Sequence, residues 1–409
     1  MAAKPGANGR RSAPTRAARA GLGRGSESGG APLVPSPSLA AVRTYADLAT
    51  LDAAMDTWET YRRYGSETTR LLEATLADLE SPDGSTTAVA RATTSGQAAL
   101  AVALSLFAAP KKRRVVIVRP CYGGTDALVA GPLGNLGLDV TPVDTIAGED
   151  DHGGRVAAVL GDDVCAVITE VITNPLMTLI DVPAIIDAAH RAGTVCIVDS
   201  TFTSPFLFQP LAYGADAVFH SLTKHLSGHS DVLGGVLLLR SDHDVADWTD
   251  SFANLLGAEL SPFDAWLSLR GLRTAALRLE RGSESAAELA TWFDDDKRVQ
   301  SVHYPGWHGE AEAGRAQQLL PGGRGPMLSI EVDGGVEAVD GFIRRLDGVR
   351  LAPSLGDVAT TISHPALTSH RNLSPERRAA LGICDGLIRI STGVESVDDL
   401  KGEFDAALG

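Results

Sequence analysis

The stretch VCIVDSTFTSPFLFQPLAYGADAVFHSLTKHLSGHSDVLGGVLLL (195–239) decides the fold, because it predicts three buried strands joined by polar corners. Its apolar runs at 195–198, 217–219 and 236–239 are bounded by polar residues, glycine or proline, which is typical of strands covered on both faces. Polar groups at the ends of such strands face the crevice in which α/β sheets bind ligands. The stretch therefore predicts one pocket shared by Asp199, Ser221, Thr223 and Lys224.

Lys224 is one of six lysines in the chain, and it follows a predicted strand and precedes a loop that contains Gly228. A lysine that is removed from water releases its proton more readily, as a lysine that forms a Schiff base must. Asp199 at a neighbouring strand end would hold a pyridinium nitrogen, and the nearby hydroxyls would hold a phosphate. These requirements describe a pyridoxal phosphate (PLP) site. On residue types alone, an ion pair of lysine and aspartate that closes the sheet is an equal alternative.

The segment DSTFTSPFLFQPLAYGADAVFHSLTKHLSGHSDVLGG (199–235) resembles the lysine signature of the PLP-dependent enzymes of Cys/Met metabolism. This family includes cystathionine γ-synthase, γ-lyases, β-lyases, methionine γ-lyase and the O-acetylhomoserine sulfhydrylases. The resemblance extends from about Pro35 to the C-terminus. It implies PLP fold type I, with a mostly parallel sheet in a large α/β domain and a smaller C-terminal α/β domain. It also implies that Lys224 binds PLP covalently and removes the Cα proton, while Asp199 keeps the ring nitrogen protonated.

The same resemblance assigns further residues to the cofactor and the substrate. Tyr122 would lie over the cofactor ring and move protons, and Asn174 would bind the phenolic oxygen of PLP. Arg389, with Ser354, would bind the substrate, the arginine at its α-carboxylate. The residues implied for the cofactor are Gly96, Gln97, Tyr122, Asn174, Asp199, Ser221, Thr223 and Lys224, with Tyr61 and Arg63 reaching the phosphate of a neighbouring subunit.

The chain also departs from the family pattern. Ser66-Glu67 and Val171-Ile172 replace the usual Asn-Pro and Ser-Pro, and Ala359 stands where cystathionine-cleaving relatives often carry glutamate. Ala359 removes a partner for a distal ammonium group, so we expect an uncharged or small Cγ substituent rather than cystathionine. Ala359, the Ser66-Glu67 change and the unusual run Thr368–Arg371 favour a specialised enzyme over a housekeeping one.

We therefore expect γ-elimination or γ-replacement on a 4-substituted 2-aminobutyrate, catalysed by a PLP-dependent lyase or transferase in specialised metabolism. One alternative is a housekeeping transsulfuration enzyme: a cystathionine γ-synthase, γ-lyase or β-lyase. The other alternative is a non-catalytic relative that serves as an assembly partner. The family further implies a homotetramer built from two catalytic dimers.

The composition of the chain indicates which kinds of binding partner are to be expected. The net charge of −15 and the absence of an apolar run that could span a bilayer argue against nucleic-acid and membrane partners. Four scattered cysteines give no disulfide framework, which favours the cytoplasm. His225 and His229 lack a third ligand at metal-binding spacing, so we expect no metal.

The sequence predicts four segments. Residues 1–45 are Arg-rich and lack hydrophobic periodicity, which is typical of a disordered arm, with an organelle transit peptide as the alternative. A dimer-contact segment (46–60), the PLP-binding large domain (61–295) and the C-terminal small domain (296–409) follow.

Overall fold

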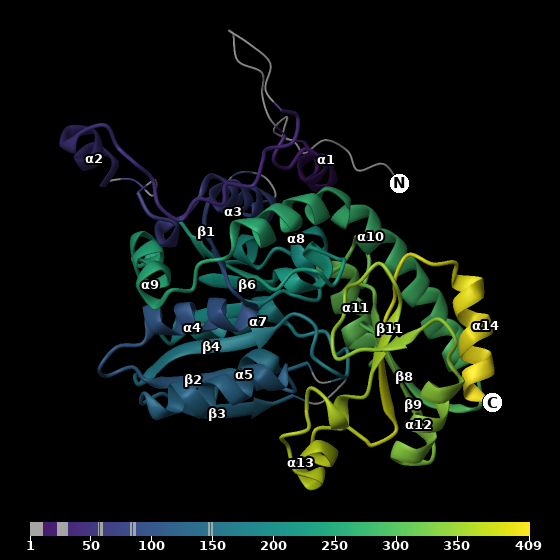
Figure 1. Cartoon of the computed structure of the whole chain (residues 1–409). Coiled ribbons are helices and arrows are strands. Elements are labelled where there is room, and N and C mark those ends of the chain that lie inside the picture. Colours follow the sequence, from purple (N-terminus) through teal and green to yellow (C-terminus); the bar gives the residue numbers. More distant parts are fainter. Residues whose placement is uncertain are drawn as a thin grey trace.

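The computed structural model describes residues 11–409 except 23–31, 56, 58–59, 82–83, 85–86, 146–147 and 149. The described residues form two β-sheets with helices packed around them (Figure 1). The fold predicted from the sequence, a mostly parallel sheet followed by a smaller α/β domain, is confirmed.

The large sheet has seven strands in the order β1-β7-β6-β5-β4-β2-β3. Strands β6, β5, β4, β2 and β3 pair in parallel, whereas β7 runs antiparallel to its neighbours β6 and β1. The strand bounds are Ala88–Thr93 (β1), Arg114–Arg119 (β2), Asp139–Asp144 (β3), Val164–Glu170 (β4), Val195–Asp199 (β5), Ala217–Ser221 (β6) and Gly235–Arg240 (β7). The three strands predicted in residues 195–239 are thus β5, β6 and β7.

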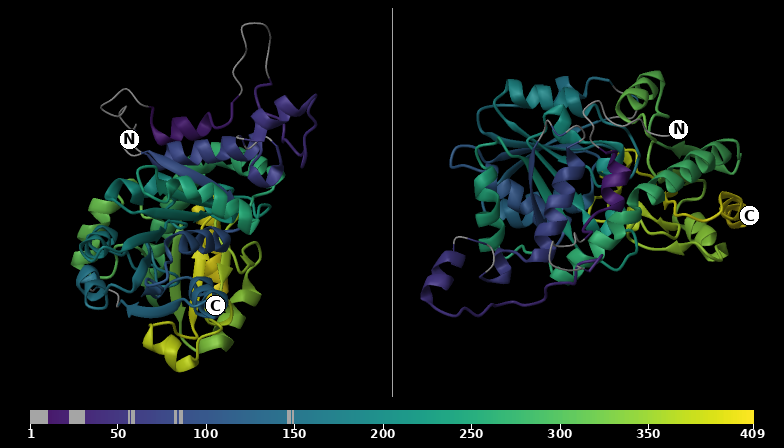
Figure 2. Two further views of the ribbon diagram at one scale, coloured as in Figure 1. Left: turned by 90° about the vertical axis from the view of Figure 1, so that its left-hand side faces the viewer. Right: turned by 90° about the horizontal axis from the view of Figure 1, so that it is seen from above.

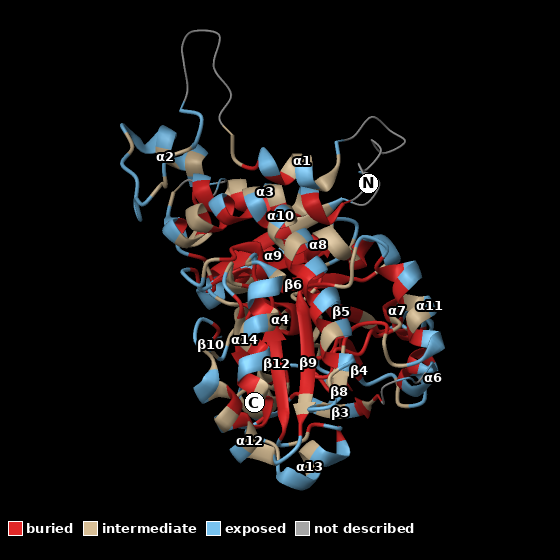
Figure 3. Ribbon diagram, turned by 90° about the vertical axis from the view of Figure 1, so that its right-hand side faces the viewer, coloured by how far each residue is buried: buried red, intermediate tan, exposed pale blue. Residues whose placement is uncertain are grey.

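Helices cover both faces of this sheet. The long ones are α3 (Glu67–Glu80), α4 (Gly96–Phe107), α7 (Val182–Arg191) and α10 (Pro262–Asp294). In β5, Cys196 and Val198 point into the core beneath α3, α7 and α10, while Ile197 points into the core beneath α4. Figure 3 shows the resulting buried strands in red. Because both faces are covered, polar side chains are placed at the strand ends.

The remaining helices of this part are short. They are α1 (Ala13–Ala18), α2 (Leu48–Met55), α5 (Gly123–Leu128), α6 (His152–Ala157), α8 (Ser204–Leu207) and α9 (Thr249–Leu256), with the single turns η1 (Arg62–Tyr64), η2 (Val129–Leu133), η3 (Pro210–Tyr213), η4 (Leu222–Leu226) and η5 (Ala246–Trp248).

The second sheet has five strands in the order β10-β11-β12-β9-β8. Its strands are Val299–His303 (β8), Met327–Val332 (β9), Arg350–Leu351 (β10), Thr361–Ser363 (β11) and Leu387–Ser391 (β12), and its helices are α11 (Glu310–Leu319), α12 (Gly335–Arg345), η6 (Pro365–Leu367), α13 (Pro375–Ala380) and α14 (Val397–Leu408). In β12, Ile388 and Ile390 pack beneath α10, α12 and α14. The alternation of side chains along a strand therefore turns Arg389 to the opposite face, toward the large domain.

The N-terminal part holds two contrasting helices. Helix α1 lies within the predicted arm and packs on α10 and α3, with Ala17 and Ala20 buried in the large-domain core. Helix α2 stands away from both sheets, and none of its residues is buried (Figures 1 and 2). The segment boundaries at 45, 60 and 295 stay predictions. Among the described helices, none has the length and apolar character needed to cross a bilayer.

Candidate active site

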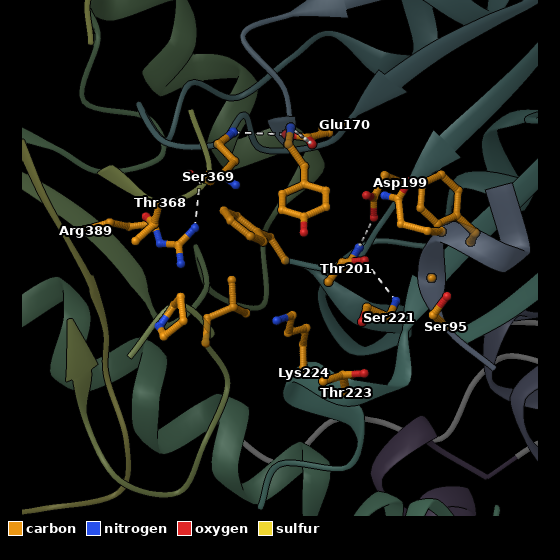
Figure 4. Close-up of a pocket in the computed structure, with 18 of the residues that line it drawn as sticks. Ser95, Glu170, Asp199, Thr201, Ser221, Thr223, Lys224, Thr368, Ser369 and Arg389 are labelled. Carbon is orange, nitrogen blue, oxygen red and sulfur yellow. Dashed lines mark hydrogen bonds between the residues drawn. The ribbon is translucent and has the colours of Figure 1, made fainter. Parts of the chain in front are cut away.

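A cavity of about 620 Å³ lies at the ends of β4, β5 and β6, lined by residues of both domains (Figure 4). The start of α4, the turn at Tyr122 and the strand ends line it from the large domain. The small domain contributes Pro353, Leu355, the loop of residues 367–371 and Arg389. Nine of the twelve residues assigned to the site from the sequence line this cavity: Gly96, Gln97, Tyr122, Asn174, Asp199, Ser221, Thr223, Lys224 and Arg389.

Lys224 lies in η4, the turn that follows β6. Its Nζ donates a hydrogen bond of 2.8 Å to Oγ of Ser354, a residue of the small domain. Burial, with a contribution from the charge of Arg389, lowers the pKa of Lys224 to about 8. The amine is therefore much more readily available in its neutral form than that of an exposed lysine.

Two carboxyl groups, Glu170 and Asp199, end the paired strands β4 and β5 directly opposite each other. Burial raises the pKa of both, and their mutual repulsion adds to the rise at Glu170. Hydrogen bonds from Thr201, and the electrostatic influence of His220, oppose this rise in the pKa of Asp199. Asp199 forms no ion pair with another described side chain and faces the cavity, so it can pair with a cation bound there.

Glu170 was not singled out from the sequence, although it shapes the cavity wall. Its Oε1 accepts a hydrogen bond of 2.6 Å from the backbone N–H of Tyr122, and its Oε2 accepts one of 3.0 Å from that of Asn174. It thereby fixes the two turns that carry these cavity residues. The signal in the sequence is an acid that ends an apolar strand, the same signal that identified Asp199.

A buried pair of side chains, Glu80 and His220, lies next to the turn that carries Asp199. His220 Nε2 lies 3.3 Å from Oε2 of Glu80, and its Nδ1 lies 3.1 Å from the backbone oxygen of Ser200, which follows Asp199. Both Glu80 and His220 are fully buried. The Glu80–His220 pair fixes the turn that follows β5. It also holds the imidazole near Asp199, where its electrostatic influence opposes the rise that burial causes in the pKa of the Asp199 carboxyl.

Arg389 is buried in the small domain, with 5% of its surface exposed. Its Nη1 donates to Asn174 Oδ1 at 2.9 Å and its Nη2 to the backbone oxygen of Ser354 at 3.0 Å. Burial lowers its pKa to about 10. No described carboxylate forms an ion pair with it, so the guanidinium is available to an anion in the cavity.

Backbone N–H groups and hydroxyls meet at the start of α4. Gly96 packs so closely against β6 that a Cβ atom there would lie 3.3 Å from Cβ of Ser221. Ser221 and Thr223 line the cavity together with Gly96. The Thr223 hydroxyl exchanges hydrogen bonds with the backbone of Gly234 at 3.3 and 3.1 Å. The side-chain oxygen of Gln97 is buried and has no hydrogen-bond partner among the described residues. A helix N-terminus flanked by hydroxyls suits a phosphate.

The donor set therefore fits PLP. It offers an amine with a lowered pKa, a carboxylate without a cationic partner, and an anion cradle at a helix start. Tyr122 is 43% exposed and lines the cavity, where a flat cofactor ring can lie against its side chain.

Three sequence-derived assignments lie outside the cavity lining. Ser354 contacts the site through Lys224 and Arg389. Tyr61 and Arg63 lie at η1, where the Arg63 guanidinium sits 5.5 Å from the Tyr61 ring and donates to the backbone oxygen of Asn254. Within a single chain, Tyr61 and Arg63 therefore do not line the cavity that holds the other assigned residues. Ala359 is exposed and does not line the cavity either.

The chain is similar in sequence to a family of PLP-dependent enzymes and to individual members of known activity. The sequence profile of a family described as Cys/Met metabolism PLP-dependent enzyme matches residues 28–409. The chain is 37% identical to a cystathionine gamma-lyase of Bacillus subtilis, over 87% of this chain and 90% of that protein. It is 36% identical to an O-succinylhomoserine sulfhydrylase of Pseudomonas aeruginosa, over 96% and 94%.

Among solved structures, the fold is similar to that of a cystathionine gamma synthase from Xanthomonas oryzae pv. oryzae, in complex with aminoacrylate and cysteine. The TM-score is 0.87 and the sequence identity 34%, with 98% of each chain covered.

Proposed function

This chain belongs to the family of PLP-dependent enzymes of Cys/Met metabolism, and on that premise we propose that it catalyses γ-elimination or γ-replacement on a 4-substituted 2-aminobutyrate. The coarser activity follows from the family: a PLP-dependent enzyme of the transsulfuration type that eliminates or replaces a substituent of an amino acid. Chemistry at Cγ is supported by the relatives. Two carry "gamma" in their names, and the third is named for a homoserine ester, whose leaving group is on Cγ. A cystathionine beta-lyase of Bacillus subtilis is equally similar, at 37% identity, so the relatives also include enzymes named for β-elimination.

The observation that carries the proposal is the link between Lys224 and Arg389 through Ser354. Ser354 Oγ accepts from Lys224 Nζ at 2.8 Å, and its backbone oxygen accepts from Arg389 at 3.0 Å. An α-amino acid whose carboxylate binds Arg389 would present its Cα next to the amine of Lys224. The same link makes Ser354 a positioning residue for both groups.

When bound, PLP supplies an electron sink that stabilises negative charge at Cα. Lys224 would hold it through Nζ, and Asp199 would keep its ring nitrogen protonated. Tyr122 would cover the ring and carry a proton at its hydroxyl, and Asn174 would bind the phenolic oxygen. The phosphate would be held by backbone N–H groups of Gly96 and Gln97 and by the hydroxyls of Ser221 and Thr223.

In this proposal, Lys224 carries out the proton transfers and Arg389 positions the substrate. Lys224 Nζ, neutral when it is free, removes the proton from Cα. It must give that proton up again before it can take a second one from Cβ, after which the substituent on Cγ can leave. Arg389 holds the carboxylate throughout and keeps Cα beside Nζ. Ile172 and Phe202 line the same cavity and add apolar surface to its wall.

We also propose a specialised rather than a housekeeping substrate. Among the described residues, the acids that line the cavity are Glu170 and Asp199, both at strand ends, and no further carboxylate of this part of the chain lines it for the distal ammonium of cystathionine. The changed segment Val171-Ile172 supports this view, because Ile172 faces the cavity.

A panel of candidate substrates tests this proposal. Cystathionine, O-acetylhomoserine, methionine and a 4-chloro amino acid are incubated with the enzyme, with and without thiol, and the products are identified by mass. Products that have lost or exchanged the Cγ substituent support the proposal. Efficient cleavage of cystathionine would contradict the specialised substrate, and pyruvate as its product would favour a β-lyase.

Capture of PLP by the apoprotein should accelerate as the pH rises through about 8 and then level off. Only the neutral amine of Lys224 attacks an aldehyde, and burial lowers the pKa of this lysine to about 8. The neutral fraction therefore rises about tenfold per pH unit below that value. Absorbance of the bound cofactor after mixing gives the rate, and a rate that climbs steadily to pH 10 would contradict the lowered pKa.

We further propose a homotetramer of two catalytic dimers in which Tyr61 and Arg63 complete the site of the partner subunit. Helix α2, just before them, exposes 82% of Leu48 and 58% of Met55, which suits a protein–protein contact.

Mixing the Arg63→Ala and Lys224→Ala proteins, each nearly inactive, should restore activity. Half of the randomly formed dimers are hybrids with one intact site, so recovery approaches about a quarter of the wild-type activity. Subunit exchange is verified by mass spectrometry of differently tagged chains. Hybrids that form without any recovered activity would contradict the shared site.

A further inference from the structure

The loop of residues 367–371 supplies a cation to the cavity that the chemistry above does not use. Leu367, Thr368, Ser369 and Arg371 of this loop all line the cavity. Figure 4 shows Thr368 and Ser369 close to Arg389, on the small-domain side.

The loop is fastened to the large domain. His370 is 2% exposed, and its Nε2 lies 3.0 Å from the backbone oxygen of Cys121, while its Nδ1 lies 2.9 Å from Oγ of Ser369. On the other side, the Ser369 backbone oxygen packs against Gly123 so closely that a Cβ atom there would overlap it. The backbone of Arg371 is therefore held at the cavity beside the Tyr122 turn.

The charge of Arg371 is uncompensated within the described chain. Its guanidinium makes no hydrogen bond or ion pair with a described residue, whereas the nearby Arg377 pairs with Asp144 at 2.6 Å and Arg378 with Asp385 at 3.1 Å. The cavity-lining acids, Glu170 and Asp199, already accept backbone N–H groups at the strand ends. An anion in the cavity can thus reach two guanidinium groups that have no carboxylate partner among the described residues, Arg389 and Arg371.

We propose that Arg371 binds an anionic group at the distal end of the substrate side chain, so that this enzyme prefers substrates whose Cγ substituent carries a carboxylate or a phosphate. The proposal rests on the function above, in which Arg389 holds the α-carboxylate. It replaces the uncharged substituent that Ala359 alone suggested, because Ala359 lies outside the cavity lining and Arg371 lies in it. The planar fork of arginine matches both anions.

Binding of two unreactive amino acids of equal length tests the proposal on the holoenzyme. L-2-Aminoadipate ends in a carboxylate and L-norleucine in a methyl group, and neither has a Cγ leaving group. Isothermal calorimetry should give about tenfold tighter binding for L-2-aminoadipate, as expected for one charge-assisted contact at a partly exposed site. High salt should reduce this ratio.

The Arg371→Ala variant should lose the ratio while keeping its affinity for L-norleucine, and Arg371→Lys should keep part of it. Arg344→Ala, which removes a 75% exposed arginine on α12, is the matched control and should behave as wild type. Equal ratios in wild type and Arg371→Ala, or a wild-type ratio near one, would overturn the proposal. Because neither ligand reacts at Cγ, this outcome is independent of whether γ-chemistry is found.

Kinetics then distinguish the two anion sources. With O-succinylhomoserine, O-phosphohomoserine and neutral O-acetylhomoserine, Arg371→Ala should raise KM for at least one anionic ester about tenfold and leave the acetyl ester within about twofold. The ester that responds identifies the anion. Equal effects on all three esters would overturn the proposal.

Discussion

Replacing Lys224 with alanine should lower kcat by at least about 10³-fold, the largest effect expected of any single substitution in this chain. Lys224 is both the attachment point of PLP and the base that takes protons from Cα and Cβ, so one substitution removes two functions. Burial and the charge of Arg389 lower the pKa of Lys224 to about 8, so that a neutral amine is available to act as the base. Steady-state turnover of the purified, PLP-saturated variant measures the loss.

The control for this experiment is Lys297→Ala, which removes an exposed lysine just after α10. That variant should keep wild-type turnover and wild-type cofactor content. A Lys224→Ala protein that retained more than about a tenth of the activity would contradict the role of the amine in proton transfer.

Replacing Arg389 with leucine should lower kcat/KM by about 10²- to 10⁴-fold, because a bidentate, charge-assisted contact to the α-carboxylate is lost in a buried site. The substitution also leaves Asn174 Oδ1 and the Ser354 backbone oxygen without their donors. Most of the effect should appear in KM. Arg389→Lys keeps the charge but not the fork, so its loss should be intermediate.

The same variant has a second, independent readout. Arg389 contributes to the lowered pKa of Lys224, so its removal should move the midpoint of PLP capture above about pH 8. An unchanged midpoint together with an unchanged KM would contradict the placement of the two cations in one cavity.

Much of this site could be predicted because parallel strands end at one edge. The apolar runs that became β5 and β6 placed Asp199, Ser221 and Lys224 together, and the structure has all three lining one cavity. Glu170 obeys the same rule, yet its contribution depends on the backbone N–H groups of Tyr122 and Asn174, one of them 48 positions away in the sequence. Such a contact becomes visible only once the chain is folded.

The departures from the family pattern were harder to interpret from sequence. Ser66-Glu67 replaces the Asn-Pro of the family, and in the structure Ser66 caps α3: its Oγ accepts from the Thr69 N–H at 3.2 Å, and its own N–H donates to Thr69 Oγ1 at 2.8 Å. Ala359 suggested an altered substrate pocket, but it lies at the surface. Arg371, which does line the cavity, stands out in the sequence only as part of the unusual run Thr368–Arg371.

Exchange of hydrogen for deuterium in L-2-aminobutyrate tests the central claim, chemistry at Cγ, most directly. Loss of a Cγ substituent requires removal of protons from both Cα and Cβ, whereas β-elimination requires removal from Cα alone. This amino acid has no leaving group, so the assay needs no knowledge of the true substrate. We expect the holoenzyme in heavy water to place deuterium at Cα and Cβ, as read by NMR. Deuterium at Cα alone would contradict the proposed function.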